Sequence, residues 1–262
     1  MMRYEVKGRL IIARARTLFL VGVFLPLLIM PGLAGATAPL VKLEHANIDL
    51  HDLDSLRRGA RYFANYCFNC HSIHFMRYSR IAKDLQIPED EVASTMLFTG
   101  AKIGDPMNIA LDPKDAKRWF GVTPPDLSVE TRARGVDWIY TYLRSFYKDE
   151  SRPWGVNNAV FKDVAMPHVL WELQGLQEAS MGVDASEGGE HTVITGFKLV
   201  EKGSMTPKEF DNAVRDIVNF LAYVGEPTKS QRLSLGRWVL AFLVVYFIVM
   251  FLLKKEYWKD VK

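Results

Sequence analysis

The segment YCFNCHS at residues 66–72 contains both cysteines of this 262-residue chain. This feature constrains the fold more than any other, because two thiols and a histidine must meet within one turn of the chain. Three uses of such a cysteine pair compete: a redox dithiol, half of a structural metal site, and a covalent haem anchor. The remaining sequence decides between them.

The surrounding sequence favours the haem anchor. No thioredoxin-like pattern of strand, helix and strand surrounds Cys67 and Cys70, and the residues before them are typical of a helix. A structural zinc ion needs four ligands, and no second Cys or His pair has finger-like spacing. In C-x-x-C-H, the two thiols bond the vinyl groups of haem and the histidine reaches the iron. The sequence therefore predicts one covalently bound haem c, anchored by Cys67 and Cys70, with His71 as a metal ligand.

Both ends of the chain predict export and membrane anchoring. Basic residues precede an apolar run that ends in the small residues GLAGATA, the pattern of a secretory signal peptide with cleavage after Ala36. An uncleaved anchor is the alternative, but the run is short and prolines interrupt it. Near the other end, Trp238–Leu253 carries no charge, and with the preceding residues it is long enough to cross a bilayer. Lysines follow, which predicts a cytoplasmic tail.

These features divide the chain into four predicted parts: a signal peptide at 1–36, an exported haem domain at 37–231, a transmembrane helix at 232–253 and a tail at 254–262. The formal net charge of +3 hides an acidic exported part. Such a domain is a poor binder of nucleic acid and a suitable docking surface for a basic protein. The sequence does not locate this surface, although Glu187 and Glu190 are candidates.

Two segments predict helices in the haem domain. Asp54 is a candidate cap for the helix that leads into the cysteine pair. Gly59 costs about 1 kcal/mol relative to alanine inside a helix, which indicates a close crossing with another backbone. Thr206 and Glu209 form a capping-box pattern for a later helix that ends near Gly225 and is followed by the polar linker EPTKSQR. One face of this later helix carries Phe210, Val214, Ile217, Val218 and Leu221.

The residues alone leave the second axial ligand of the haem open. Met166 lies before the stiff Pro167 and far enough beyond His71 for the chain to return to the opposite face of the haem. His168 is the rival, because haem with two histidine ligands is also common. Met181 lies in a stretch rich in glycine, serine and glutamate that is interpreted as a mobile loop.

Several segments together resemble the bacterial form of the cytochrome c1 family, the haem subunits of bc1 complexes (ubiquinol–cytochrome c oxidoreductases). They occur in the family's order: SLRRGARYFANYCFNCHS at 55–72, GVTPPDLSVETRARG at 121–135, AMP at 165–167, DIVNFLAYVGEP at 216–227, and the C-terminal apolar run. The resemblance implies a mainly α class I c-type cytochrome domain with long loops, in which the helix before the cysteines crosses the last helix of the domain. One transmembrane helix follows. Alternating side chains add a small β-hairpin around Val193, Thr195, Phe197 and Leu199.

The resemblance also implies roles for individual residues. It makes Met166 the axial methionine opposite His71, and it places Arg134 against a haem propionate. A ligating imidazole is commonly oriented by a backbone carbonyl, and the stiff Pro124–Pro125 pair can present one, so Pro125 is a candidate cofactor-binding residue. The alternatives are a merely rigid loop at the prolines and a solvated arginine.

The implied function is electron transfer in the bc1 complex. The chain would take single electrons from a Rieske iron–sulfur protein and pass them to a c-type cytochrome acceptor during quinol oxidation, next to cytochrome b and membrane lipid. With both axial positions filled, the chain is not expected to be catalytic by itself. We expect a single-pass protein of the bacterial inner membrane, with its haem domain in the periplasm and its C-terminus in the cytoplasm. The alternative is a stand-alone membrane-anchored c-type cytochrome that donates to a terminal oxidase or reductase.

Overall fold

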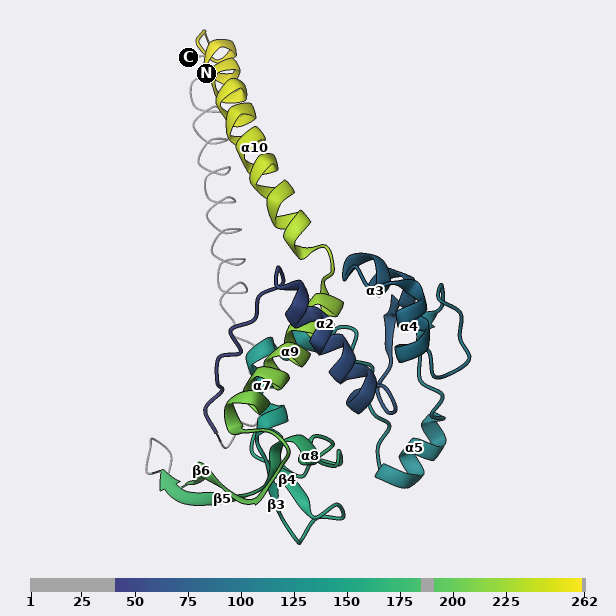
Figure 1. Cartoon of the computed structure of the whole chain (residues 1–262). Helices are drawn as coiled ribbons and strands as arrows, with labels where there is room; N and C mark the ends of the chain where they lie inside the picture. Colours follow the sequence, from purple (N-terminus) through teal and green to yellow (C-terminus); the bar gives the residue numbers. More distant parts are fainter. Residues whose placement is uncertain (1–40, 185–190, 261–262) are drawn as a thin grey trace, which may run out of the picture. The chain divides into compact units, whose positions relative to one another are not determined.

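The computed structural model describes residues 41–184 and 191–260. In these residues helices predominate, and the strands form two-stranded antiparallel sheets with long irregular connections between them (Figure 1). The predicted mainly α fold class is therefore confirmed. The predicted signal peptide and both candidate acidic residues, Glu187 and Glu190, lie outside the described residues.

The described helices are α2 (Leu53–Tyr62), α3 (Tyr78–Asp84), α4 (Glu89–Met96), α5 (Pro113–Phe120), α6 (Glu130–Ala133), α7 (Val136–Arg144), α8 (Trp171–Gln174), α9 (Pro207–Gly225) and α10 (Lys229–Tyr257), with a π-helix, η1 (Phe63–Cys67), continuing α2. The described strands are β1 (Ile73–Arg77), β2 (Pro106–Met107), β3 (Phe146–Lys148), β4 (Val156–Asn158), β5 (Gly175–Asp184) and β6 (His191–Lys202). Strand β1 pairs with β2, β3 with β4, and β5 with β6.

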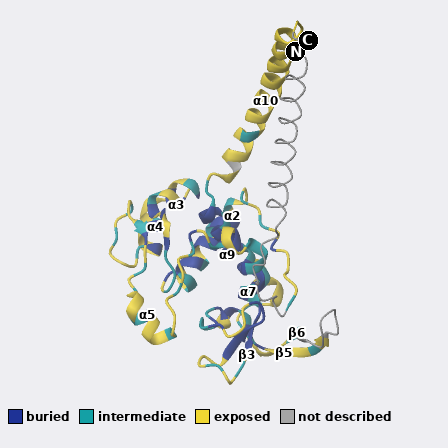
Figure 2. Cartoon of the chain, turned by 180° about the vertical axis from the view of Figure 1, so that it is seen from behind, coloured by how far each residue is buried: buried dark blue, intermediate teal, exposed yellow. Residues whose placement is uncertain are grey.

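Helices α2 and α9 cross with their backbones in contact; α9 is largely buried, and α2 buries the side that faces it (Figures 1 and 2). A Cβ atom added to Gly59 would lie only 2.0 Å from the backbone oxygen of Asp216. No other residue type fits at this position without moving one of the helices. The predicted crossing is thus confirmed, and the close approach explains the glycine in the middle of a helix.

A buried polar cluster lies at the same crossing. The Asp216 carboxylate accepts hydrogen bonds from Arg58 Nε and from Ser55 Oγ, both at 2.6 Å. Asn219 Nδ2 donates to Ser55 Oγ at 2.9 Å and to the carbonyl oxygen of Asp49 at 2.7 Å. A buried carboxylate without such partners would be strongly destabilising, so these bonds restrict the crossing to one arrangement.

The N-termini of α2 and α9 both follow capping rules, and one predicted cap needs correction. Helix α2 begins at Leu53, so its cap is Asp52, whose carboxylate accepts the Ser55 N–H at 2.9 Å. The prediction of Asp54 as the cap was wrong by two residues; Asp54 lies in the first turn, where a negative charge still favours the helix. At the start of α9, the predicted capping box of Thr206 and Glu209 is confirmed, and the hydrogen bonds from Thr206 lower the pKa of Glu209.

The buried face of α9 also matches the prediction. Helical spacing places its predicted apolar residues on one side, and all of them are buried: Phe210, Val214, Ile217, Val218 and Leu221. The polar linker after α9 is shorter than predicted, because α10 already begins at Lys229 and takes up most of EPTKSQR.

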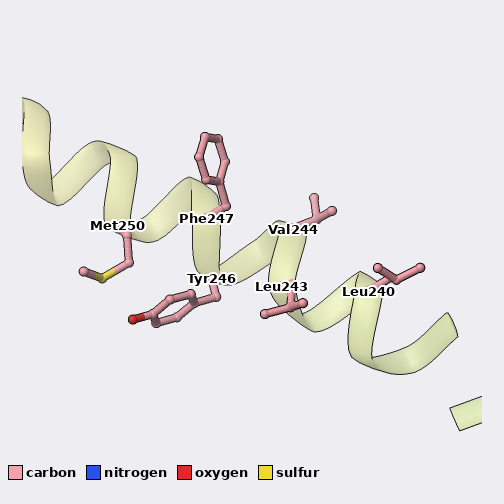
Figure 3. Close-up of a pocket in the computed structure, with 6 residues that line it drawn as sticks. All are labelled: Leu240, Leu243, Val244, Tyr246, Phe247 and Met250. Atoms are coloured by element: carbon pink, nitrogen blue, oxygen red, sulfur yellow. The ribbon is translucent and has the colours of Figure 1, made fainter. Parts of the chain in front are cut away.

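Helix α10 supplies one candidate membrane span, Gln231–Tyr257, of 27 residues, in which an 18-residue window has a mean hydropathy of 2.3. Among the described helices it alone is long and apolar enough to cross a membrane, which fits a single-pass anchor. Figure 3 shows side chains that line a shallow hollow along this helix and project from it, and they are almost entirely apolar: Leu240, Leu243, Val244, Tyr246, Phe247 and Met250. This surface suits contact with lipid or with another apolar helix and offers no catalytic group.

The predicted strand pair around residues 193–199 is confirmed as part of a longer hairpin, β5–β6. The interpretation of the stretch around Met181 as a loop was wrong, because Met181 lies in β5 and pairs with Ile194 of β6. The polar composition misled the prediction, since the hairpin projects both polar and apolar side chains into solvent. Ladder hydrogen bonds with β6, which local composition does not reveal, stabilise β5 as a strand.

The crossing of α2 and α9 predicts the effect of filling Gly59. Gly59→Ala should lower the free energy of unfolding by about 1–3 kcal/mol, because overpacking the backbone contact outweighs the gain in helix propensity. Thermal unfolding of the haem-loaded protein in detergent measures this. Gly236→Ala is the matched control, because a Cβ at Gly236 in α10 meets nothing within 4 Å. Equal stability of the two variants would contradict the proposed role of Gly59.

Candidate cofactor site

The two cysteines and His71 lie together in the turn that ends η1. Cys67 is the last residue of η1, and its carbonyl oxygen accepts hydrogen bonds from the backbone N–H groups of Cys70 at 3.1 Å and His71 at 2.9 Å. The two cysteines do not form a disulfide with each other. This turn brings two thiols and one imidazole close together at the end of the α2 segment, which is the arrangement that a covalent haem anchor requires.

Two observations argue against the other uses of the cysteine pair, which are the redox dithiol and the structural zinc site. Burial raises the pKa of Cys67 to about 12 and also raises the pKa of Cys70. A catalytic dithiol instead needs a thiol with a lowered pKa, because the thiolate is the nucleophile. In the described part of the chain, no group of three or more His, Cys, Asp or Glu side chains could hold a metal ion. A zinc site therefore finds no support there.

The π-helix η1 was not anticipated from the sequence. The N–H of Phe68 donates to the carbonyl oxygen of Phe63 at 2.9 Å, five residues back, which widens the last turn before the motif. The rings of these two residues pack 5.8 Å apart, and Phe63 also packs 5.5 Å from Phe220 of α9. Short π segments often occur at functional sites. Here tertiary packing of aromatic rings fixes the wide turn, and the local sequence carries no signal for it.

The imidazole of His71 is oriented by a backbone carbonyl. His71 Nδ1 lies 2.8 Å from the carbonyl oxygen of Pro125. Because that oxygen can only accept, Nδ1 must carry the proton, and Nε2 keeps its lone pair. Burial lowers the pKa of His71, which favours the neutral ring. A neutral imidazole with a free Nε2 lone pair is the form that binds a metal, so His71 fits the role of haem ligand.

The residues after Pro125 hold its carbonyl in place. The backbone of Leu127 donates to the carbonyl oxygen of Ser72 at 2.9 Å, and the carboxylate of Asp126 accepts the His74 N–H at 2.8 Å. The hydroxyl of Ser128 accepts the Phe75 N–H at 3.1 Å. The PDLS sequence thus runs alongside the chain that follows His71, and Asp126, Leu127 and Ser128 each form a hydrogen bond with the backbone of that chain.

The two candidates for the second axial ligand lie in different environments. Met166 is partly exposed, and its Sδ accepts a hydrogen bond from the Tyr142 hydroxyl at 3.3 Å. His168 is 6% exposed and stacks on Phe146 with the ring centroids 5.0 Å apart and the planes at 4°. Burial lowers the pKa of His168 to about 4. The histidine is therefore packed into the protein as a neutral ring, while the thioether lies closer to the surface.

Arg134 is a fixed cation. Its Nε donates to the carboxylate of Glu130, and its guanidinium lies over the ring of Trp138, 4.5 Å from the centroid. The Arg134 guanidinium also lies over the ring of Phe161, 5.5 Å from its centroid. Arg134 is exposed, and these three neighbours restrain its side chain, so its role at a haem propionate stays a prediction. Trp138 and Tyr142 were not singled out by sequence reasoning, although the successive spacing of four residues from Arg134 to Trp138 and from Trp138 to Tyr142 is a usable signal.

Two thiols and an oriented imidazole in one turn, together with a C-terminal apolar helix, are the features of a membrane-anchored c-type cytochrome. Comparisons with known proteins narrow this class. A model of the Cytochrome C1 family matches residues 44–261. The chain therefore belongs to the cytochrome c1 family, whose members carry haem c and are part of the bc1 complex with cytochrome b.

Individual relatives support the family assignment. Cytochrome c1 of Allochromatium vinosum is 57% identical over 84% of this chain and 89% of its own length. A protein named ammonia monooxygenase gamma subunit, of Nitrosomonas europaea, is 46% identical over 90% of this chain and 96% of its own length. Cytochrome c1 of Blastochloris viridis is 28% identical over 81% of this chain and 83% of its own length.

Asp126 provides a test of the segment that carries the Pro125 carbonyl. Asp126→Ala removes the acceptors for the backbone N–H groups of His74 and Ser128. The free energy of unfolding should fall by about 1–2 kcal/mol, because two hydrogen bonds to a charged group at an exposed site are lost. Denaturant unfolding of the haem-loaded protein measures this. Asp115→Ala on α5 is the control, since within 41–184 and 191–260 the ion pair of Asp115 is with the exposed Arg118. An equal loss in both variants would argue against the role of Asp126 in holding the Pro125 segment.

Proposed function

We propose that the chain is the electron-transfer haem subunit of a respiratory bc1 complex. It takes single electrons from a Rieske iron–sulfur protein and passes them to a c-type cytochrome acceptor during quinol oxidation. The observation that carries this proposal is the His71 imidazole, held by the Pro125 carbonyl with its Nε2 lone pair free, in a chain of the cytochrome c1 family.

Four residues hold the cofactor in this proposal. Cys67 and Cys70 would bond it covalently, and His71 and Met166 would ligate its iron. When bound, the haem supplies a one-electron redox couple whose potential depends on the axial ligands and on burial. Pro125 keeps the His71 ring in the ligating tautomer. With both axial positions filled, the chain carries electrons and leaves the chemistry of quinol oxidation to the complex.

Met166 suits the second axial position better than His168. The hydrogen bond from Tyr142 uses one lone pair of the Met166 sulfur and leaves the other for the iron. His168 is stacked against Phe146 inside the protein, and turning it outward would break that packing. The soft thioether also raises the reduction potential relative to a second imidazole.

Arg134 is proposed to bind a haem propionate. A guanidinium forms two parallel hydrogen bonds with a carboxylate, and here it is already oriented by Trp138 and Phe161. The Nε of Arg134 contacts Glu130, which leaves its terminal nitrogens for a second carboxylate. The stacking contacts reduce the side-chain entropy that such binding would otherwise cost.

The proposed topology follows from the two ends of the chain. The signal peptide at 1–36 directs export, and the haem domain at 37–231 lies in the periplasm of a bacterium. The helix at 232–253 spans the inner membrane, in contact with cytochrome b and lipid, and the lysine-bearing tail at 254–262 remains in the cytoplasm. The acidic character of the exported part suits a basic electron acceptor, so we expect the transfer rate to fall as salt rises.

Two other assemblies compete with this proposal. A stand-alone anchored cytochrome that donates to a terminal oxidase or reductase would use the same haem ligands and the same helix. The printed name of the Nitrosomonas relative suggests a subunit of an ammonia-oxidising enzyme. The family model and the higher identity to the Allochromatium cytochrome c1 favour the bc1 complex over both.

Purification in mild detergent distinguishes the three assemblies. If the proposal is right, cytochrome b and a Rieske protein migrate with the chain, and the purified complex reduces an added c-type cytochrome with quinol. Deleting residues 232–262 is the matched control, because it should release a red domain that carries no cytochrome b. Purification of the full chain without cytochrome b, or together with an ammonia-oxidising enzyme, would contradict the proposal.

Met166→Leu tests the ligand assignment. The haem should stay attached through the cysteines, while the reduction potential falls and the ferrous protein gains the ability to bind carbon monoxide. Redox titration and absorption spectra of the purified protein measure both effects. His168→Leu is the control at the rival position, and it should retain the potential of the unmodified protein. The reverse pattern would assign the iron to His168.

A further inference from the structure

Four side chains spaced four residues apart form a continuous stack along one side of α7: Arg134, Trp138, Tyr142 and Phe146. The guanidinium of Arg134 lies 4.5 Å from the ring centroid of Trp138, and the Trp138 ring stacks on Tyr142 at 5.0 Å with an interplanar angle of 10°. The edge of the stack continues to Phe146, whose ring lies 5.2 Å from Tyr142 at 71°. Residues four apart on a helix face the same side, which explains how a single helix aligns most of this stack.

Tyr142 connects this stack to the candidate ligand Met166. Its hydroxyl donates to Met166 Sδ at 3.3 Å, and among the described residues this is the hydrogen bond that the hydroxyl makes. Trp138 on one face and Phe146 at the edge prevent the ring from turning away. The hydroxyl therefore points at the sulfur in a fixed direction.

We propose that Tyr142 is a positioning residue that sets the reduction potential of the haem through its hydrogen bond to the Met166 sulfur. The proposal rests on the ligation by Met166 argued above. A hydrogen bond to the sulfur draws electron density from it and weakens its donation to iron. Donation stabilises the ferric state more than the ferrous state, so the bond favours the ferrous state and raises the potential.

The hydrogen bond also restrains the orientation of the Met166 sulfur. A methionine side chain is flexible and can approach a metal in more than one rotamer. With one lone pair engaged by Tyr142, the other lone pair of the sulfur would be left to bind the iron. The stack from Arg134 to Phe146 thereby links the two side chains proposed to bind the haem, Arg134 and Met166, through Trp138 and Tyr142 of α7.

Tyr142→Phe in the full haem-loaded chain tests the proposal. The ring packing is kept and only the hydroxyl is lost, so haem attachment and methionine ligation should persist. The redox equilibrium should shift about two- to tenfold toward the ferric form, where a tenfold shift in a one-electron couple equals about 59 mV. Redox titration measures the shift, and the sulfur-to-iron charge-transfer band of the ferric protein reports that methionine still binds.

Tyr140→Phe is the matched control on the same helix. The Tyr140 ring lies 4.8 Å from the guanidinium of Arg144, and its hydroxyl makes no hydrogen bond to Met166 in the described structure. This variant should keep the potential of the unmodified protein. An equal shift in both variants would show a general effect of removing a hydroxyl from α7 and would overturn the proposal.

The outcomes separate this proposal from the ligand assignment. If Met166→Leu lowers the potential but Tyr142→Phe leaves it unchanged, Met166 is the ligand and the role of Tyr142 is refuted. If Met166→Leu changes neither the potential nor the charge-transfer band, the ligand assignment fails and this proposal fails with it. Should Tyr142→Phe not accumulate with haem, proton NMR of the unmodified ferrous protein decides. A slowly exchanging Tyr142 hydroxyl proton close to the Met166 methyl group supports the bond, and a freely exchanging one overturns it.

Discussion

The contact between the backbones of α2 and α9 at Gly59 is the constraint on which the rest of the haem domain depends. Because no side chain separates the helices there, their distance and angle are set by main-chain atoms, and the buried Asp216 carboxylate restricts the crossing further through Ser55 and Arg58. The turn with the cysteines and His71 follows directly from α2 through η1. Phe63 and Phe220 then join that turn to α9, so the position of the cofactor anchor derives from the helix crossing.

The candidate site combines two kinds of support. The His71 side is braced by backbone hydrogen bonds, in which the PDLS segment lies along the chain after the motif and presents the Pro125 carbonyl. The Met166 side is braced by aromatic packing, in which α7 contributes Trp138 and Tyr142. A rigid imidazole needs one fixed acceptor, whereas a flexible thioether needs restraint from several directions. The two different supports match the two different side chains.

Sequence reasoning predicted those features that follow from local rules. The capping box of Thr206 and Glu209, the close approach at Gly59 and a proline carbonyl beside His71 each depend on a residue type with a narrow set of uses. It failed where tertiary contacts decide. The wide turn of η1 depends on Phe220, far along the chain, the strand at Met181 depends on pairing with β6, and the hydroxyl of Tyr142 meets Met166 only after folding. The roles of the haem ligands remain predictions, argued from geometry and from membership of the family.

The π-helix has a consequence for how this segment tolerates insertion and deletion. A π turn holds one residue more than an α turn, so the loss of a single residue at 63–66 would be absorbed by reverting to ordinary helix, with the cysteine pair left on the same side of α2. The loss of a second residue there has no extra residue to absorb it and would rotate everything downstream by about 100°, since an α-helix has 3.6 residues per turn. The cysteines would then face a different side of α2 from the one defined by Gly59, even though every motif residue would still be present. The phase between the glycine and the cysteine pair, and not the pentapeptide by itself, is therefore the quantity that evolution or design must preserve.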